Sequence, residues 1–107
     1  MSIAHWVRRG VQRFVPIAAT IRRRLDAGLL PTKAPVTTFA GYGWSHPCDA
    51  CDQPIRPAQV QYDLEYWHPF RVFRLHIGCH GLWEAECRRR RHRRRSWRGL
   101  LAGLYRL

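Results

Sequence analysis

Four residues with metal-binding side chains stand in two pairs near the middle of the chain. Cys48 and Cys51 form the first pair, His76 and Cys79 the second, and 24 residues separate Cys51 from His76. Thiolate sulfur and imidazole nitrogen are ligands that Zn²⁺ prefers, and a structural zinc ion takes four of them at tetrahedral corners. Two intervening residues let a tight turn, or the first turn of a helix, direct both members of a pair at one ion. The spacing therefore predicts a closed, structural Zn²⁺ site.

Other uses of the cysteines and histidines stay open at this point. Cys87 lies eight residues beyond Cys79, about two helical turns or ~12 Å further along a helix, and His80 follows Cys79 directly. Either could replace His76 as a ligand. Four cysteines could also pair as two disulfides in a secreted protein. Arginines interrupt the first 30 residues and leave no apolar core for a secretory signal, so we expect thiolates on a metal in a reducing, cytoplasmic compartment.

Charge is the second strong signal. Nineteen basic residues oppose seven acidic ones, a formal net charge of +12, and all but Lys33 of the basic residues are arginine. A GC-rich genome would explain the excess of arginine over lysine, but it would not explain a cluster. Arginine suits bidentate contacts with phosphate. The cluster consists of Arg88, Arg89, Arg90, Arg91, Arg93, Arg94 and Arg95.

The N-terminal part, residues 1–30, is predicted to be a basic amphipathic helical segment. Apolar residues recur at helical spacing over residues 3–15, and Pro16 ends or kinks that helix. A second short helix carries Ile17, Ile21 and Leu25 on one side, with arginines around the other. Such a segment either docks on a partner, lies on an anionic membrane, serves as a targeting peptide, or simply covers the core.

Three further segments follow. Residues 31–46 are predicted to be a linker because proline and glycine interrupt every run. Residues 47–95 are predicted to form the zinc-binding domain, with strands over 60–66 and 71–75 joined as a hairpin and a helix from His76 through the arginine cluster. Residues 96–107 form an amphipathic tail. Phe39, Tyr42 and Trp44 lie in or beside the linker, and we expect them to pack against the domain rather than to stack on bases.

The order of turn, hairpin and helix carries a resemblance. The stretch Cys48-x2-Cys51-x2-Pro54-Ile55, followed by His76-x2-Cys79-x3-Trp83, resembles treble-clef zinc fingers. In ligand spacing it is similar to the first half of a LIM domain and to the nick-binding fingers of poly(ADP-ribose) polymerases. The resemblance covers about residues 47–90. It implies a small α+β fold, a zinc-stabilised treble clef, here flanked by basic amphipathic helices. The chain has neither the second zinc module of LIM domains nor a recognisable DNA-end platform.

These features predict a zinc-stabilised protein that binds nucleic acid, DNA or RNA, mainly through phosphate contacts from the arginine-rich helix. Two alternatives remain: a LIM-like adaptor that binds a protein partner through its apolar stripes, and a protein that lies on a membrane surface through its basic amphipathic helices. We do not expect an enzyme, because a catalytic zinc site keeps an open coordination position and a nearby base. The pattern does not predict the oligomeric state.

Overall fold

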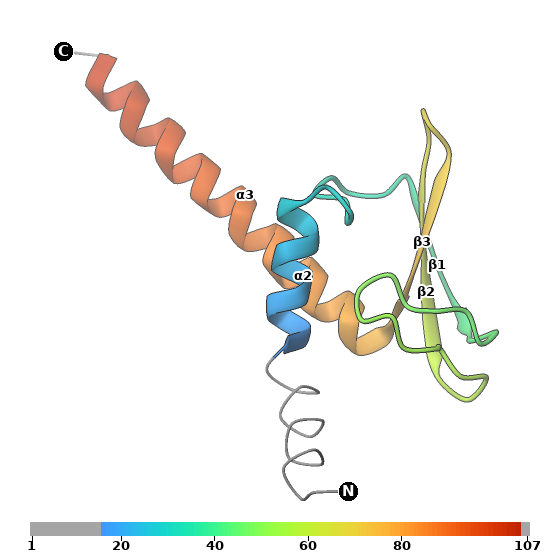
Figure 1. Cartoon of the computed structure of the whole chain (residues 1–107). Coiled ribbons are helices and arrows are strands. Elements are labelled where there is room, and N and C mark those ends of the chain that lie inside the picture. Colours follow the sequence, from blue (N-terminus) through green and yellow to red (C-terminus); the bar gives the residue numbers. More distant parts are fainter. Residues whose placement is uncertain (1–15, 106–107) are drawn as a thin grey trace, which may run out of the picture.

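The computed structural model describes residues 16–105, which form a helix, a three-stranded sheet and a long second helix (Figure 1). Helix α2 spans Pro16–Asp26 and helix α3 spans Ile77–Tyr105. The strands are β1 (Thr37–Tyr42), β2 (Val60–Tyr66) and β3 (Arg71–His76). The predicted apolar stripe over residues 3–15 lies outside the described residues. In the described part, neither helix has the length and apolar character that crossing a membrane requires.

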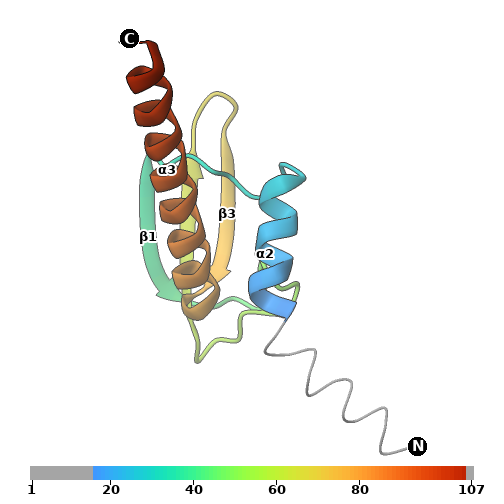
Figure 2. The ribbon, with the colours of Figure 1, turned by 90° about the vertical axis from the view of Figure 1, so that its left-hand side faces the viewer.

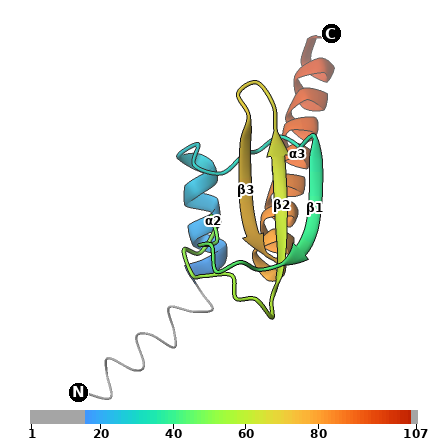
Figure 3. The same cartoon turned by 90° about the vertical axis from the view of Figure 1, so that its right-hand side faces the viewer.

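The sheet is antiparallel, in the order β1-β2-β3. Within residues 16–105, only one of its faces is covered by a helix (Figures 2 and 3). Figure 2 shows α3 running in front of the sheet, and Figure 3 shows the opposite face with no helix over it. Leu64 on β2 pairs with Phe73 on β3, and both side chains are buried on the α3 side together with Leu75. Side chains of successive residues in a strand point to opposite faces of the sheet. The residues next to these three, such as Asp63 and Arg74, therefore point to the open face.

Helix α2 packs against α3 beside the sheet. Ile21 and Leu25 of α2 are buried in the same core as Trp83 and Cys87 of α3. The indole N–H of Trp83 donates a hydrogen bond to the backbone carbonyl of Pro31 at 2.8 Å. This bond connects helix α3 with the segment that follows α2. This contact spans 52 positions of the sequence, so Trp83 holds together parts of the chain that have no local reason to meet.

Several predicted elements are confirmed. The short helix before Asp26 is present, with Gly28 in the left-handed region (φ 74°) just after it, as expected for a residue that ends a helix. The hairpin of β2 and β3 and the helix that follows it also match. Helix α3 continues without a break across position 95, because no proline occurs after Cys79 to stop it. Residues 96–105 of the predicted C-terminal tail are thus the last part of α3.

Two expectations fail between residues 31 and 46. This stretch is not only a linker, because β1 lies in it and pairs with β2 from Thr37 opposite Glu65 to Tyr42 opposite Val60. Phe39, Tyr42 and Trp44 are exposed, so the prediction that they pack against the domain is wrong. The strand forms through backbone pairing at a sheet edge while burying little side-chain surface, and for this reason it leaves no hydrophobic pattern in the sequence.

The different surroundings of two tryptophans on α3 lead to a prediction of stability. Trp83→Ala should lower the free energy of unfolding by about 3–5 kcal/mol, because Trp83 is 4% exposed and a cavity would remain. Trp97→Ala, at a site that is 66% exposed, should change it by less than ~0.5 kcal/mol. Urea denaturation followed by circular dichroism measures both. Equal effects of the two substitutions would contradict the described packing of α3.

Candidate metal centre

The first ligand pair lies on a tight turn after β1. The backbone N–H of Cys48 donates to the carbonyl of Gln53 at 2.9 Å, and the N–H of Asp52 donates to the carbonyl of Cys48 at 2.8 Å. Asp52 adopts a left-handed conformation (φ 66°), which aspartate tolerates better than most residues. The N–H of Ala50 points at the sulfur of Cys48, 3.4 Å away. Such a donor stabilises negative charge on the sulfur.

The second pair lies where β3 becomes α3. His76 is the last residue of β3, and Cys79 stands in the first turn of α3. The Nε2–H of His76 donates to the carbonyl of Pro54 at 3.1 Å. A carbonyl accepts and cannot donate, so this bond places the ring proton on Nε2 and leaves Nδ1 with a free lone pair. The atom directed at the cysteines is therefore the one able to bind a metal.

The four ligand atoms form a compact cluster. The three sulfur atoms and Nδ1 of His76 all lie within 4.8 Å of one another. Nδ1 of His76 is 3.4 Å from Sγ of Cys51 and 3.9 Å from Sγ of Cys79. A tetrahedral site with Zn–S bonds of ~2.3 Å and Zn–N bonds of ~2.0 Å has ligand-to-ligand edges of roughly 3.5–3.8 Å. The cluster therefore fits one small, tetrahedrally coordinated metal ion.

The three thiols in this cluster lie close enough to affect one another's ionisation. Hydrogen bonds with the thiols of Cys51 and Cys79 hold the pKa of Cys48 well below its usual value. The same contacts with Cys48 raise the pKa of Cys51 and of Cys79. Because Cys48 and Cys79 are buried, three thiolates would repel one another there unless a positive ion lay between them. The donor set thus has the chemistry of a site for a metal cation.

The alternative ligands lie elsewhere. The ring of His80 stacks on Tyr62, with centroids 4.3 Å apart and planes 10° from parallel. The thiol of Cys87 is buried and faces the carbonyl of Pro31 at 3.7 Å, and burial raises its pKa. The structure therefore groups His76 with the three cysteines, while His80 and Cys87 belong to the packing around α3.

Contacts that the sequence pattern did not predict hold the first ligand pair in place. Asp49 donates its backbone N–H to the carbonyl of Arg74 at 2.9 Å and accepts the N–H of Arg74 on its carboxylate at 2.8 Å, which ties the turn to β3. The guanidinium of Arg24 on α2 donates to the carbonyl of Asp49 at 2.6 Å and pairs with the carboxylate of Asp52. This pairing lowers the pKa of Asp52. Only the spatial arrangement reveals these roles, since Arg24 is 25 positions from Asp49.

The arginine cluster lies on the middle of α3, and its members fall into two groups. Arg88 pairs with Glu84 at 3.3 Å, Arg89 with Glu86 at 2.8 Å, and Arg90 with Asp26 at 2.9 Å. The other group has no carboxylate partner within the described residues and is exposed to solvent. It consists of Arg91, Arg93, Arg94 and Arg95.

Comparison with known proteins identifies no protein similar to this chain. No protein-family model, no curated protein and no solved structure matches this chain significantly. The interpretation of the cluster therefore rests on its own geometry.

Two cysteines on the same helix provide a matched test of the ligand set. Cys79→Ala should abolish stoichiometric metal binding, because it removes one corner of the cluster. Cys87→Ala, at an equally buried site outside the cluster, should retain it. Elemental analysis of the purified variants measures the metal content. Loss of metal from the Cys87 variant with retention in the Cys79 variant would assign the fourth ligand to Cys87.

The pKa shifts predict that metal binding releases protons. The pKa values of Cys51 and Cys79 are raised, so thiol protons should leave these residues when a metal binds. The metal-bound thiolates have a lower pKa than free thiols. The stability they contribute is consequently present at neutral pH and is lost as the pH falls. Calorimetry in buffers of different ionisation enthalpy measures the protons, and release of none would contradict thiolate ligation.

Proposed function

We propose that this chain is a zinc-stabilised protein that binds nucleic acid through phosphate contacts from α3. The observation that carries the proposal is the combination of a metal-binding cluster at the start of α3 with a row of arginines further along the same helix that have no carboxylate partner among residues 16–105. The cluster anchors the helix to the sheet, and the arginines extend beyond the body of the molecule, where α3 projects away from the sheet (Figure 1). A rigid basic helix of this kind can follow a phosphate backbone.

Zinc is the metal we propose for the cluster, and a treble clef is the fold type. Three thiolates and one imidazole in a tetrahedral arrangement are typical of structural Zn²⁺. The support for a treble clef is the order of the parts: a cysteine turn, a hairpin, and a helix with the second ligand pair at its start. Four protein ligands fill the tetrahedron, which favours a structural over a catalytic role. We further propose a reducing compartment, in which the cysteines would stay available as thiolate ligands.

A basic hollow between the two helices supports the phosphate contacts. This hollow, of about 600 Å³, is lined by five arginines and two acidic residues. Three of the arginines, Arg22 on α2 and Arg93 and Arg94 on α3, have no carboxylate partner among residues 16–105. The buried carboxylate of Glu86 is already neutralised by Arg89 and Arg90. The hollow therefore carries uncompensated positive charge, which attracts a phosphate group.

The exposed apolar side chains near the end of α3 favour a second function, the protein adaptor. Trp97, Leu100 and Leu101 are exposed, although they recur at helical spacing. A stripe of this kind binds the groove of a protein partner, or an anionic membrane surface together with the neighbouring arginines. The adaptor proposal is favoured over nucleic acid if salt has little effect on partner binding and Trp97→Ala weakens it.

The proposed phosphate contacts predict a steep dependence of binding on salt. If Arg91, Arg93, Arg94 and Arg95 each neutralise one phosphate, the affinity for duplex DNA should fall with a log–log slope of roughly −4. Arg93→Gln with Arg94→Gln should flatten the slope by about 2 and weaken all sequences alike, because phosphate contacts carry no base information. Fluorescence anisotropy at a series of salt concentrations measures the slope.

A control variant separates this surface from net charge. Lys33→Gln with Arg56→Gln removes the same two charges from exposed positions far along the chain from α3, and it should leave the slope nearly unchanged. If both double variants flatten the slope equally, only the net charge matters and the arginine row is not the binding surface. A wild-type preference for anionic vesicles over nucleic acid at physiological salt would favour the membrane function instead.

A further inference from the structure

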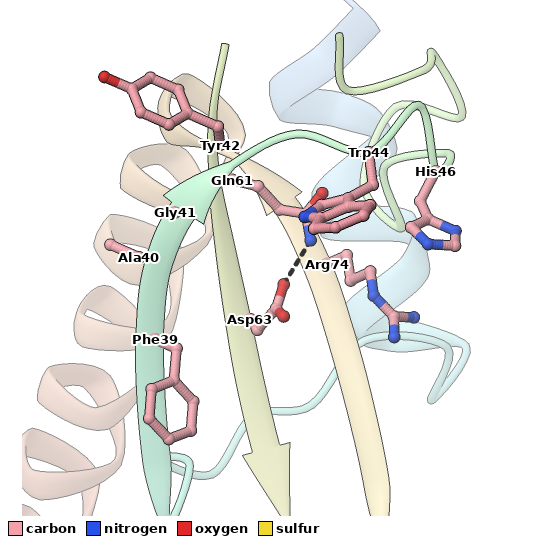
Figure 4. A pocket seen from close by; sticks show the side chains of 9 residues that line it. All are labelled: Phe39, Ala40, Gly41, Tyr42, Trp44, His46, Gln61, Asp63 and Arg74. Atoms are coloured by element: carbon pink, nitrogen blue, oxygen red, sulfur yellow. Dashed lines mark hydrogen bonds between the residues drawn. The ribbon is translucent and has the colours of Figure 1, made fainter. Parts of the chain in front are cut away.

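The open face of the sheet holds a second hollow, well apart from the arginine row. It has a volume of about 400 Å³ and lies over β1, β2 and β3 (Figure 4). Phe39 on β1, Asp63 on β2 and Arg74 on β3 are partners across the sheet, so their side chains share this face. Trp44, just after β1, lines the same hollow.

Two aromatic side chains bound the hollow and remain exposed. Phe39 is 55% exposed and Trp44 is 80% exposed. Large aromatic rings usually bury most of their surface, so two such rings beside one hollow mark a place where a flat partner can stack. The floor between them is open because Gly41, opposite Gln61, has no side chain, and a Cβ at this position would meet nothing within 4 Å.

Gln61, which also lines the hollow, has a buried polar atom without a partner. The residue is 5% exposed, and its Nε2 donates to the carboxylate of Asp63 at 2.7 Å. A carboxylate only accepts hydrogen bonds, so the atom of the Gln61 amide that contacts Asp63 must be the donor Nε2. The carbonyl oxygen Oε1 is therefore the amide atom that does not contact Asp63. Oε1 has no hydrogen-bond partner within the described residues. A buried acceptor without a donor destabilises the free protein, and an N–H group of a ligand would relieve that cost.

The charges around the hollow are arranged for a polar, flat ligand linked to an anion. Asp63 forms no ion pair within residues 16–105, so its carboxylate adds acceptors beside Gln61. Arg74 supplies a guanidinium at the other side of the hollow (Figure 4). The lining thus combines stacking surfaces, hydrogen-bond acceptors and a cation.

We propose that this hollow binds one unpaired nucleobase that carries an amino group, with the base stacked between Phe39 and Trp44. The amino or ring N–H groups donate to Gln61 and Asp63, and Arg74 contacts the adjoining phosphate. Trp44, four-fifths exposed, has room to turn and admit the ligand beside Oε1 of Gln61. Guanine fits best, because its N1–H and N2 amino group are neighbouring donors, whereas thymine and uracil offer a single N–H between two carbonyl groups.

This inference rests on the proposed function and makes it more specific, since it adds single-strand and base preference to phosphate contacts. Stacking of bases on exposed aromatic rings, beside a basic surface, is a general means of binding single strands. A cationic peptide is the competing occupant, because aromatic rings and a carboxylate also attract cations. The net charge of +12 and the presence of Arg74 in the lining favour nucleic acid over such a peptide.

The test uses the full metal-loaded chain and three probes: an eight-nucleotide thymidine oligomer, the same oligomer with one central guanosine, and a duplex. The wild-type protein should bind the guanosine oligomer about fivefold more tightly than the thymidine oligomer, as one added hydrogen bond implies. Gly41→Val should remove this preference, because a Cβ at this position meets nothing within 4 Å, so the added side chain occupies part of the hollow, and a β-branched residue suits a strand. Phe39→Ala should weaken both single strands by about fivefold or more.

The matched control is Phe70→Ala, at an equally exposed ring on the β2–β3 turn and outside the hollow, which should leave all affinities unchanged. Duplex affinity should be the same for every variant. If the duplex binds and Gly41→Val and Phe39→Ala leave single-strand affinity and base preference unaltered, the inference is wrong while the proposed function stands. If neither duplex nor single strands bind, both are wrong. Binding of a lysine-rich peptide that Gly41→Val abolishes would assign the hollow to a cationic partner instead.

Discussion

The close approach of three thiols and one imidazole is the constraint on which the arrangement of the turn, the sheet and α3 depends. The four ligand atoms come from a turn after β1, the last residue of β3 and the first turn of α3. Three thiolates this close together would repel one another, and a cation between them would remove the repulsion. Because His76 ends the strand and Cys79 begins the helix, a bound ion would fix the angle at which α3 leaves the sheet.

The acidic residues are few, and most of them hold the fold together. Asp49 and Asp52 connect the ligand-bearing turn to β3 and α2, while Asp26 and Glu86 connect α2 to the first half of α3. The arginines near these carboxylates are neutralised, whereas those further along α3 have no carboxylate partner in the part of the chain that the structure describes. Like charges at neighbouring helical positions destabilise a helix slightly, so the row from Arg91 to Arg95 is unfavourable for stability alone. A partner that supplies negative charge would offset this cost, which is consistent with the proposed phosphate contacts.

The two faces of the sheet differ in a way that separates stability from binding. Leu64, Phe73 and Leu75 form the covered face and supply the core against the helices. The open face carries exposed aromatic rings, an unpartnered acceptor and an arginine, none of which contributes to a core. Features that cost stability are retained in proteins chiefly where they serve binding. The open face is where we propose that a base stacks, and the arginine row is where we propose phosphate contacts.

The sequence alone determined the two cysteines of the turn and Cys79 as ligand candidates, the β2–β3 hairpin and the two described helices, because each of them follows from local spacing or periodicity. It did not determine β1, since an edge strand that buries little surface has no hydrophobic pattern. It also left the choice among His76, His80 and Cys87 open. Tertiary structure decided that choice, because the hydrogen bond from His76 to Pro54 and the stacking of His80 on Tyr62 join residues far apart in the chain. Pairing across space likewise decided which arginines are neutralised, since the contact between Arg90 and Asp26 depends on how α2 packs on α3.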